Sequence, residues 1–170
     1  AVVAVVVLFV LRDGSEPTPS ILNVAVAPTA PARLVSPQGD VTVDVASGSV
    51  STPAQLRYLP VAADAVPQLP PGYIASQNVF DLSLVPEAGS SAISVSILNP
   101  ITITVRLTTG DLSLAGGAAS NVVIQHYDDG DDSWAALLTT VDFTASTAQV
   151  QVDSLSIFAL TIRLGASAAM

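Results

Sequence analysis

The stretch PITITVRL, residues 100–107, decides the fold that we expect for this chain. Its apolar residues alternate with polar ones, which places the two kinds of side chain on opposite faces of an extended segment. Pro100 stands at the first position, where a strand tolerates the missing N–H. The pattern therefore predicts a β-strand with one buried and one solvated face.

The period of two continues on both sides of this stretch, and no convincing amphipathic helix interrupts it. Residues 108–120 are rich in Gly and Ala and predict an irregular segment with one helical turn. We expect an all-β fold, an antiparallel β-sandwich of about ten short strands that spans residues 32–163. The other predicted strands are residues 40–45, 54–59, 79–85, 93–97, 121–127, 134–139, 141–144, 148–152 and 155–163.

Composition narrows the classes of function. Half of the 170 residues are hydrophobic and the net charge is −9, so the chain has the material for a packed core and an acidic surface. The five basic residues are all Arg and are scattered, whereas a nucleic-acid partner needs clustered cations, so no nucleic-acid binding is expected. Cysteine is absent, which excludes disulfides and thiolate metal sites. The excess of Asp, Thr, Ser, Ala and Val is typical of secreted bacterial β-proteins, so we expect an extracytoplasmic location.

An apolar tract, AVVAVVVLFVL, occupies residues 1–11. As a helix it would rise only about 16 Å, short of the roughly 20 residues that cross a bilayer. It reads as the end of a transmembrane helix that begins before Ala1, as a remnant of a signal sequence, or as a β-strand, for which its Val, Leu and Phe are suited. Such a strand would either belong to its own domain or complete the sheet of a neighbouring subunit.

Residues 12–31 follow as a Pro-, Thr- and Ala-rich linker that starts with the charged residues Arg12 and Asp13, and residues 164–170 form a tail. An apolar tract that ends in a charged stop and a stiff linker indicates a tether. The expected partners are a membrane, contacted through residues 1–11, or protein subunits, either copies of this chain or members of a larger complex.

Four carboxylates flank a glycine at residues 128–132. An Asp-Gly sequence between two strands favours a solvated hairpin turn. The alternative is a Ca²⁺ site, since calcium takes six to eight oxygen ligands, although the ligand order of a helix–loop–helix calcium loop is missing. The candidate ligands are Asp128, Asp129, Asp131 and Asp132, and no other cofactor is expected.

His126 is the only histidine, so any histidine-dependent catalysis must use it. It precedes Asp128 by two residues, and serines are plentiful, but the Gly-x-Ser-x-Gly turn that exposes a nucleophilic serine does not occur. We therefore interpret His126 as a polar residue near a strand end. The aromatic residues, Trp134 and Tyr127 among them, suit a core better than a carbohydrate platform.

Two stretches resemble the ZU5 and UPA family of β-sandwich domains and related bacterial cell-surface modules. Residues 38–50, QGDVTVDVASGSV, look like the opening strand and turn of that family, and residues 134–141 followed by 152–160 look like its closing strands. Some relatives cleave themselves at a His-Phe-Ser site in the last strand. The resemblance puts Ser156 at the nucleophile position and Ser154 where the histidine should stand, so it implies no self-cleavage here.

The sequence thus predicts a non-catalytic, extracytoplasmic structural or interaction module tethered through residues 1–11, as an accessory subunit of a membrane or cell-surface complex. The alternative is a filament or surface-layer subunit that donates this tract to its neighbour. A hydrolase with an unrecognised site is the third hypothesis.

Overall fold

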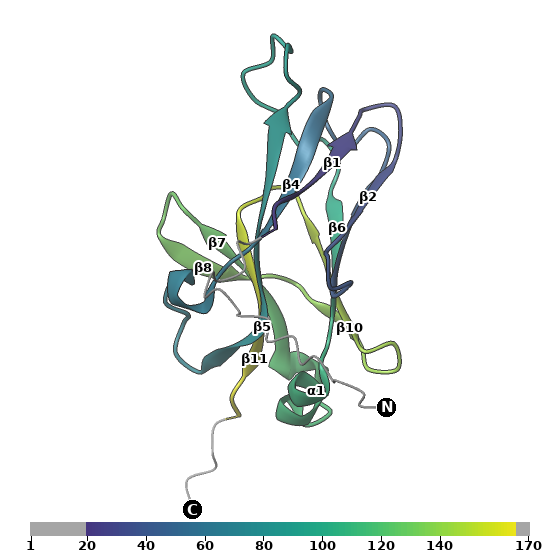
Figure 1. Ribbon diagram of the computed structural model, residues 1–170. Helices are drawn as coiled ribbons and strands as arrows, with labels where there is room; N and C mark the ends of the chain where they lie inside the picture. Colours follow the sequence, from purple (N-terminus) through teal and green to yellow (C-terminus); the bar gives the residue numbers. More distant parts are fainter. Residues whose placement is uncertain (1–19, 166–170) are drawn as a thin grey trace, which may run out of the picture.

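Two antiparallel sheets packed face to face form the part of the chain that the computed structural model describes, residues 20–165 (Figure 1). The predicted all-β sandwich is confirmed. The larger sheet contains, in spatial order, β1 (Leu22–Val26), β4 (Ala54–Pro60), β5 (Tyr73–Pro86), β11 (Ile157–Arg163), β7 (Val122–Asp128) and β8 (Ser133–Ala136). The smaller sheet contains β2 (Ala32–Val35), β3 (Val41–Val45), β6 (Ile101–Arg106), β10 (Thr147–Val152) and β9 (Thr140–Asp142).

The alternation in the sequence becomes the alternation between core and solvent. In β6, Ile101, Ile103 and Val105 are fully buried, while the residues between them are partly exposed. From the larger sheet, Phe80, Leu82 and Phe158 meet them with no exposed surface. Burial of apolar side chains from both inner faces is the main source of stability in such a sandwich.

The chain itself closes both sides of the sandwich. On one side, a turn with a bridge between Ala27 and Ala30 carries β1 of the larger sheet into β2 of the smaller one. On the other side, β8 runs into β9 through residues 137–139, which we call the crossing segment. The crossing segment is held to β7, because Leu137 N donates to the Ile124 carbonyl at 3.0 Å and Ile124 N donates to Thr139 Oγ1 at 2.9 Å.

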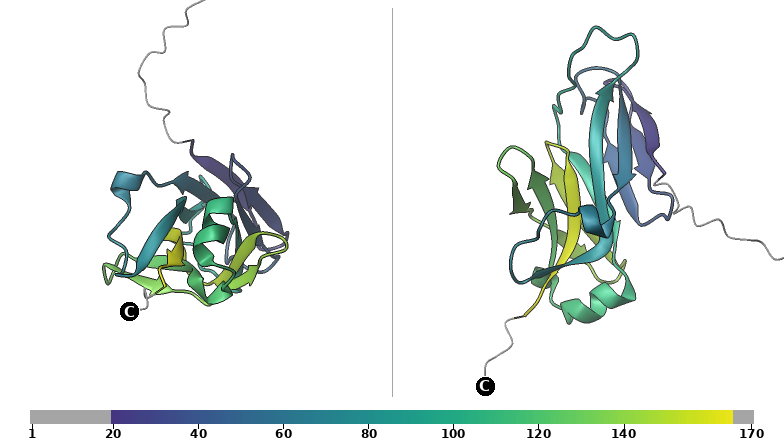
Figure 2. Two further views of the ribbon diagram at one scale, coloured as in Figure 1. Left: turned by 90° about the horizontal axis from the view of Figure 1, so that it is seen from below. Right: turned by 60° about the vertical axis from the view of Figure 1, so that its left-hand side comes forward.

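One helix, α1 (Thr109–Ala115), lies at the end of the sandwich opposite to the loop of residues 87–100 (Figures 1 and 2). Thr108 begins it with a capping box, since its hydroxyl accepts from Asp111 N at 3.1 Å and its own N–H donates to the Asp111 carboxylate at 2.8 Å. Gly116 ends it in the left-handed conformation, with φ of 59°. The short 3₁₀ helices are Ala63–Ala65 and Ala119–Asn121.

Part of the segment expected to be a linker belongs to the sandwich. Within residues 12–31, Leu22–Val26 form β1 and pair with β4 over five positions. Pro28 and Pro31 lie in and after the turn between β1 and β2, so they bound these strands instead of preventing them. The sandwich therefore includes Leu22–Val26, which lie before the expected boundary at residue 32.

The strand predicted at residues 93–97 is wrong. These residues lie in the long loop between β5 and β6, where a single bridge joins Ile97 to Val50. Their Ser/Ile alternation has the period of a strand, but Ile93 is 99% exposed and has no sheet to face. Periodicity alone does not make a strand without a partner for its backbone groups.

Among the described residues, no helix is long and apolar enough to cross a membrane. Residues 1–11, for which the sequence predicts an anchor or a donor strand, lie outside the described part of the chain.

Replacement of Phe158 by Ala tests the core. We expect it to lower the free energy of unfolding by about 3–5 kcal/mol, because it opens a cavity between the sheets. Urea unfolding monitored by circular dichroism measures the change. Ile93→Ala, at an exposed apolar position, is the matched control and should change stability by less than about 0.5 kcal/mol. Equal effects of the two substitutions would contradict the packing described here.

Candidate functional site

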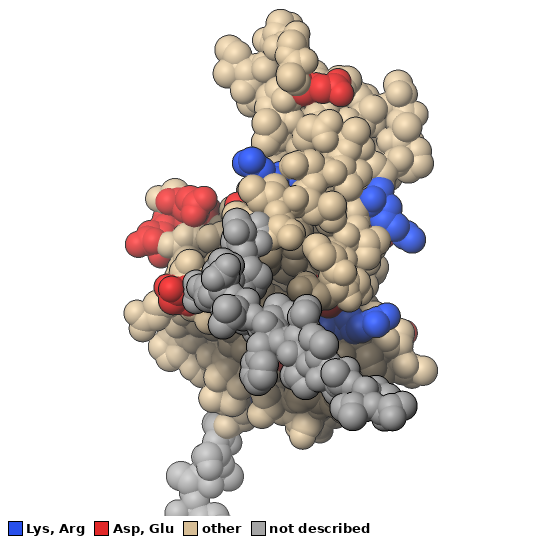
Figure 3. Space-filling view, viewed as in Figure 1, with Lys and Arg blue, Asp and Glu red and all other residues tan. Residues whose placement is uncertain are grey.

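The end of the larger sheet beside the β7–β8 turn brings together most of the residues singled out in the sequence. His126 lies opposite Phe158 in the pairing of β7 with β11, and Ser156 immediately precedes β11. The acidic turn of residues 128–132 connects β7 to β8. Figure 3 shows the acidic side chains gathered on this side of the molecule, whereas the end that carries the loop of residues 87–100 has little charge on the same face.

His126 is the last member of a row of rings on the inner face of the larger sheet. Its imidazole stacks on Phe158 with 4.6 Å between ring centroids. Phe158 is 5.9 Å from Phe80, and Phe80 is 5.7 Å from Tyr58. The row crosses four neighbouring strands, β7, β11, β5 and β4. His126 is thus packed as a half-buried part of the core at its polar end.

Ser156 is the hydrogen-bond partner of this histidine. Its Oγ lies 2.9 Å from His126 Nε2, and the same hydroxyl donates to the main-chain carbonyl of Tyr127. The resemblance to ZU5 and UPA domains puts Ser154 where a base would stand and implies no base beside Ser156. The structure corrects this, because the register of β7 against β11 supplies a histidine from 30 residues away.

The geometry of the pair favours a structural role over a nucleophilic one. Because the hydroxyl hydrogen of Ser156 points to the Tyr127 carbonyl, the imidazole Nε2 carries its own hydrogen and donates it to Oγ. An imidazole in this form has no lone pair on Nε2 with which to take a proton from serine. Among the described residues, no carboxylate lies within 4.0 Å of a ring nitrogen to orient the ring as the third member of a triad.

Burial lowers the pKa of His126, because the charged imidazolium loses hydration in its half-buried position. The carboxylates of Asp128, Asp153 and Asp129 act in the opposite direction without overcoming this effect. The neutral imidazole is therefore the form that the folded protein prefers near neutral pH.

The acidic turn uses two of its four carboxylates in protein hydrogen bonds. Asp128 Oδ1 accepts from the main-chain N–H of Gly130 at 2.8 Å and of Asp131 at 3.3 Å, as in an Asx turn. Asp132, with φ of 51°, accepts from the Tyr127 hydroxyl, and this bond raises the pKa of Tyr127 to about 12. Within residues 20–165, no three carboxylate or histidine groups converge as metal ligands would. The turn conformation accounts for Asp128 and Asp132, and the calcium site stays a prediction.

The aromatic residues lie in the core or against a covering loop. Tyr58, Phe80 and Phe158 are almost fully buried. On the outer face of the larger sheet, Trp134 packs against Tyr127 with 5.1 Å between centroids and donates its indole N–H to the Pro67 carbonyl at 3.3 Å. Since that loop covers Trp134, the pair of Trp134 and Tyr127 does not form an open aromatic platform of the kind that binds sugars.

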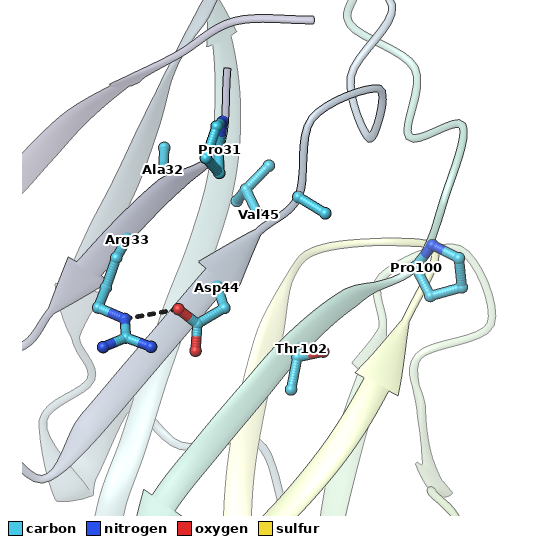
Figure 4. A pocket seen from close by; sticks show the side chains of 8 residues that line it. Pro31, Ala32, Arg33, Asp44, Val45, Pro100 and Thr102 are labelled. Carbon is cyan, nitrogen blue, oxygen red and sulfur yellow. Dashed lines mark hydrogen bonds and ion pairs between the residues drawn. The ribbon is translucent and has the colours of Figure 1, made fainter. Parts of the chain in front are cut away.

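A separate shallow hollow lies on the outer face of the smaller sheet (Figure 4). An ion pair between Arg33 and Asp44, with Nε and Oδ1 2.6 Å apart, borders it, and Pro31 and Pro100 stand at its rim. Both charged side chains are well exposed, so the pair contributes little to stability. Thr102, the partner of Asp44 in the pairing of β3 with β6, adds a hydroxyl to the lining of the hollow.

Comparison with known proteins adds no identification: no known family matches the chain, and no curated protein resembles it in sequence. The resemblance to ZU5 and UPA domains therefore stays a prediction.

The pKa of His126 predicts a pH dependence of stability. Since the folded state lowers this pKa, the unfolded chain binds a proton more readily, and stability should fall as the pH drops through 6.5, the ordinary value for histidine. Urea unfolding at pH 7.5 and pH 5.5 measures the loss. His126→Gln keeps a hydrogen-bond donor without titrating and should flatten the profile. A wild-type protein that is more stable at pH 5.5 would contradict the assignment.

For the acidic turn, we expect calcium to leave the melting temperature unchanged, because protein donors already occupy Asp128 and Asp132. Thermal unfolding at up to about 10 mM calcium covers even weak protein sites, whose Kd is of the order of 10⁻³ M. A rise in melting temperature that Asp131→Asn removes would instead establish the calcium site.

Proposed function

We propose that the chain is a non-catalytic structural or interaction module that works outside the cytoplasm and is tethered through residues 1–11. In this role it serves as an accessory subunit of a membrane or cell-surface complex. The acidic composition rich in Asp, Thr and Ser supports an extracytoplasmic location.

The observation that carries the proposal is the two-sheet core formed within the described residues. Among residues 20–165, eleven strands lie between Leu22 and Arg163, and they supply a hydrophobic core from both inner faces. We infer that the eleven-residue tract without a polar side chain is surplus to this core. Apolar surface of that size is stabilised by burial against something else, either lipid or another protein.

The state of the polar residues supports a non-catalytic role. The single histidine donates to Ser156, whose hydroxyl is engaged by a main-chain carbonyl, and Asp128 and Asp132 are engaged within the acidic turn. Hydrolysis of simple esters or peptides that is lost in His126→Ala would contradict this part of the proposal.

The direction of β1 supports a tether at one end of the sandwich, which would present the other end, the one with the loop of residues 87–100, to a partner. The registers of β1 with β4 and of β4 with β5 place Leu22 level with Leu82, and Val26 level with Pro86. The first residue of β1 is therefore the end of the strand that lies farther from the loop of residues 87–100, and β1 runs toward that loop. The exposed Ile93 and Leu98 of that loop, 99% and 62% accessible, lie at the end of the sandwich that a tethered module presents outward.

A filament or surface-layer subunit that donates residues 1–11 is the second candidate. A specific observation favours it, namely that within residues 20–165 β9 pairs with only half of β10 and leaves a strand edge open beside an uncharged hollow. An open edge is where an added strand binds.

Deletion of residues 1–16 tests the tether. We expect the truncated chain to be monodisperse, to lose binding to vesicles or to other copies, and to keep the melting temperature of the full chain within a few degrees, since the core is unchanged. Light scattering after size exclusion, vesicle flotation and thermal unfolding measure these properties. A truncated chain that fails to fold would show that the tract belongs to the core of its own domain.

A further inference from the structure

The edge of the smaller sheet beside β9 is only half covered. Thr147, Ala148 and Gln149 of β10 pair with β9, whereas β6 pairs with β10 along its whole length. Val150, Gln151 and Val152 therefore have a strand on one side only among the described residues. β9 covers no more of β10 because the chain enters the smaller sheet only at Thr140, after it has passed from β8 through the crossing segment.

A hollow lies beside this open half of β10. Val150 contributes to it from β10 itself, and its other lining residues are uncharged, namely Pro100, Leu137, Leu138, Thr140, Gln149 and Gln151. Leu138 is 96% exposed, although its neighbours in the crossing segment are fixed to β7 by hydrogen bonds. The fold thus holds a leucine side chain in solvent next to unpaired strand backbone.

The hollow beside this edge has no charged lining residue, although the chain has a net charge of −9. Sheet edges are commonly blocked by charged side chains, prolines or bulges, which prevent unwanted pairing. Here Pro100 precedes β6 and Asp153 follows Val152, so both blocking features lie at one end of the open half of β10. The stretch beside Val150 and Gln151 is open to an uncharged extended segment.

Residues 1–11 have the chemistry of such a segment. They contain no charged or polar side chain, and seven of them are β-branched or aromatic, counting six Val and one Phe. The linker that follows, residues 12–21, reaches at most about 36 Å when extended. The linker leads to β1, at an edge of the larger sheet, and β1 continues into β2, at the edge of the smaller sheet opposite to β9. A tract from the same chain would therefore have to pass around the sandwich to reach β10. A tract from a second copy approaches the open edge without that detour.

We propose that the open half of β10, with the hollow beside Leu138, is the acceptor for residues 1–11 of a second copy of this chain. The proposal rests on the second candidate function and names its acceptor site. The incoming tract adds a short strand to the smaller sheet next to Val150–Val152, in line with β9. Its apolar side chains cover Leu137 and Leu138, and backbone hydrogen bonds complete the edge.

The test compares single substitutions in the full chain by analytical ultracentrifugation. Leu138→Lys places a charge in the acceptor at a position whose exposure spares the fold, and Gln151→Lys does the same from the strand. Val6→Asp places a charge in the donor tract. Ile93→Lys is the matched control, an equally exposed apolar residue in the loop of residues 87–100. We expect the first three to weaken assembly at least about tenfold, the scale of losing one buried leucine contact, and the control to assemble like the wild type.

Mixing provides the decisive measurement. The Leu138→Lys chain keeps an intact donor and the Val6→Asp chain an intact acceptor, so each alone should be monomeric. Their mixture should form a complex that stops at one copy of each, with twice the 17.2 kDa mass of one chain. A tract that merely aggregates would not give a complex of fixed composition.

Two results would overturn the proposal in different ways. Assembly that survives Leu138→Lys and Gln151→Lys but not Val6→Asp would place the acceptor elsewhere, for instance at β1, and leave the second candidate function standing. A wild-type chain that stays monomeric and floats with phosphatidylcholine vesicles through residues 1–11 would remove both the acceptor and the second candidate, in favour of a membrane tether.

Discussion

Contact between the two inner faces of the sandwich is the interaction on which the rest of the structure depends. β11 lies at the centre of the larger sheet and pairs with both β5 and β7, so Phe158 meets Phe80 on one side and His126 on the other. Opposite it, β6 presents three fully buried aliphatic side chains. Every strand whose inner face joins this contact has its register fixed, because a slip of one residue would turn its apolar side chains outward.

This constraint also explains the positions of the polar residues. His126 follows Val122 and Ile124 on the inner face of β7, where the core reaches its end, and Ser156 satisfies its ring nitrogen. Asp128 is the last residue of β7, two residues after His126. Its carboxylate accepts hydrogen bonds from main-chain N–H groups of the turn that follows. The residues that suggest chemistry in the sequence thus satisfy the polar groups at the end of a β-sandwich.

The sequence predicted what depends on neighbours along the chain and missed what depends on register. The strands at residues 101–106 and 147–152 follow from alternation, because each has one face in the core. β1 was assigned to a linker, since its pairing with β4 is not visible in a short run flanked by prolines. Residues 93–97 alternate equally well but lack a partner strand. The hydrogen bond of His126 with Ser156, and the half-covered β10, arise from pairings between distant segments that a single sequence does not display.

The direction of β1 has a mechanical consequence. β1 is an edge strand whose N-terminal end faces away from the loop of residues 87–100 and from the open half of β10, and it is held to β4 at five successive positions. If the tether pulls on Leu22 while a partner holds the opposite end of the sandwich, the force acts along β1. The hydrogen bonds between β1 and β4 then bear the load together in shear, and they do not open one after another as in a zipper. An edge strand in this orientation resists extension.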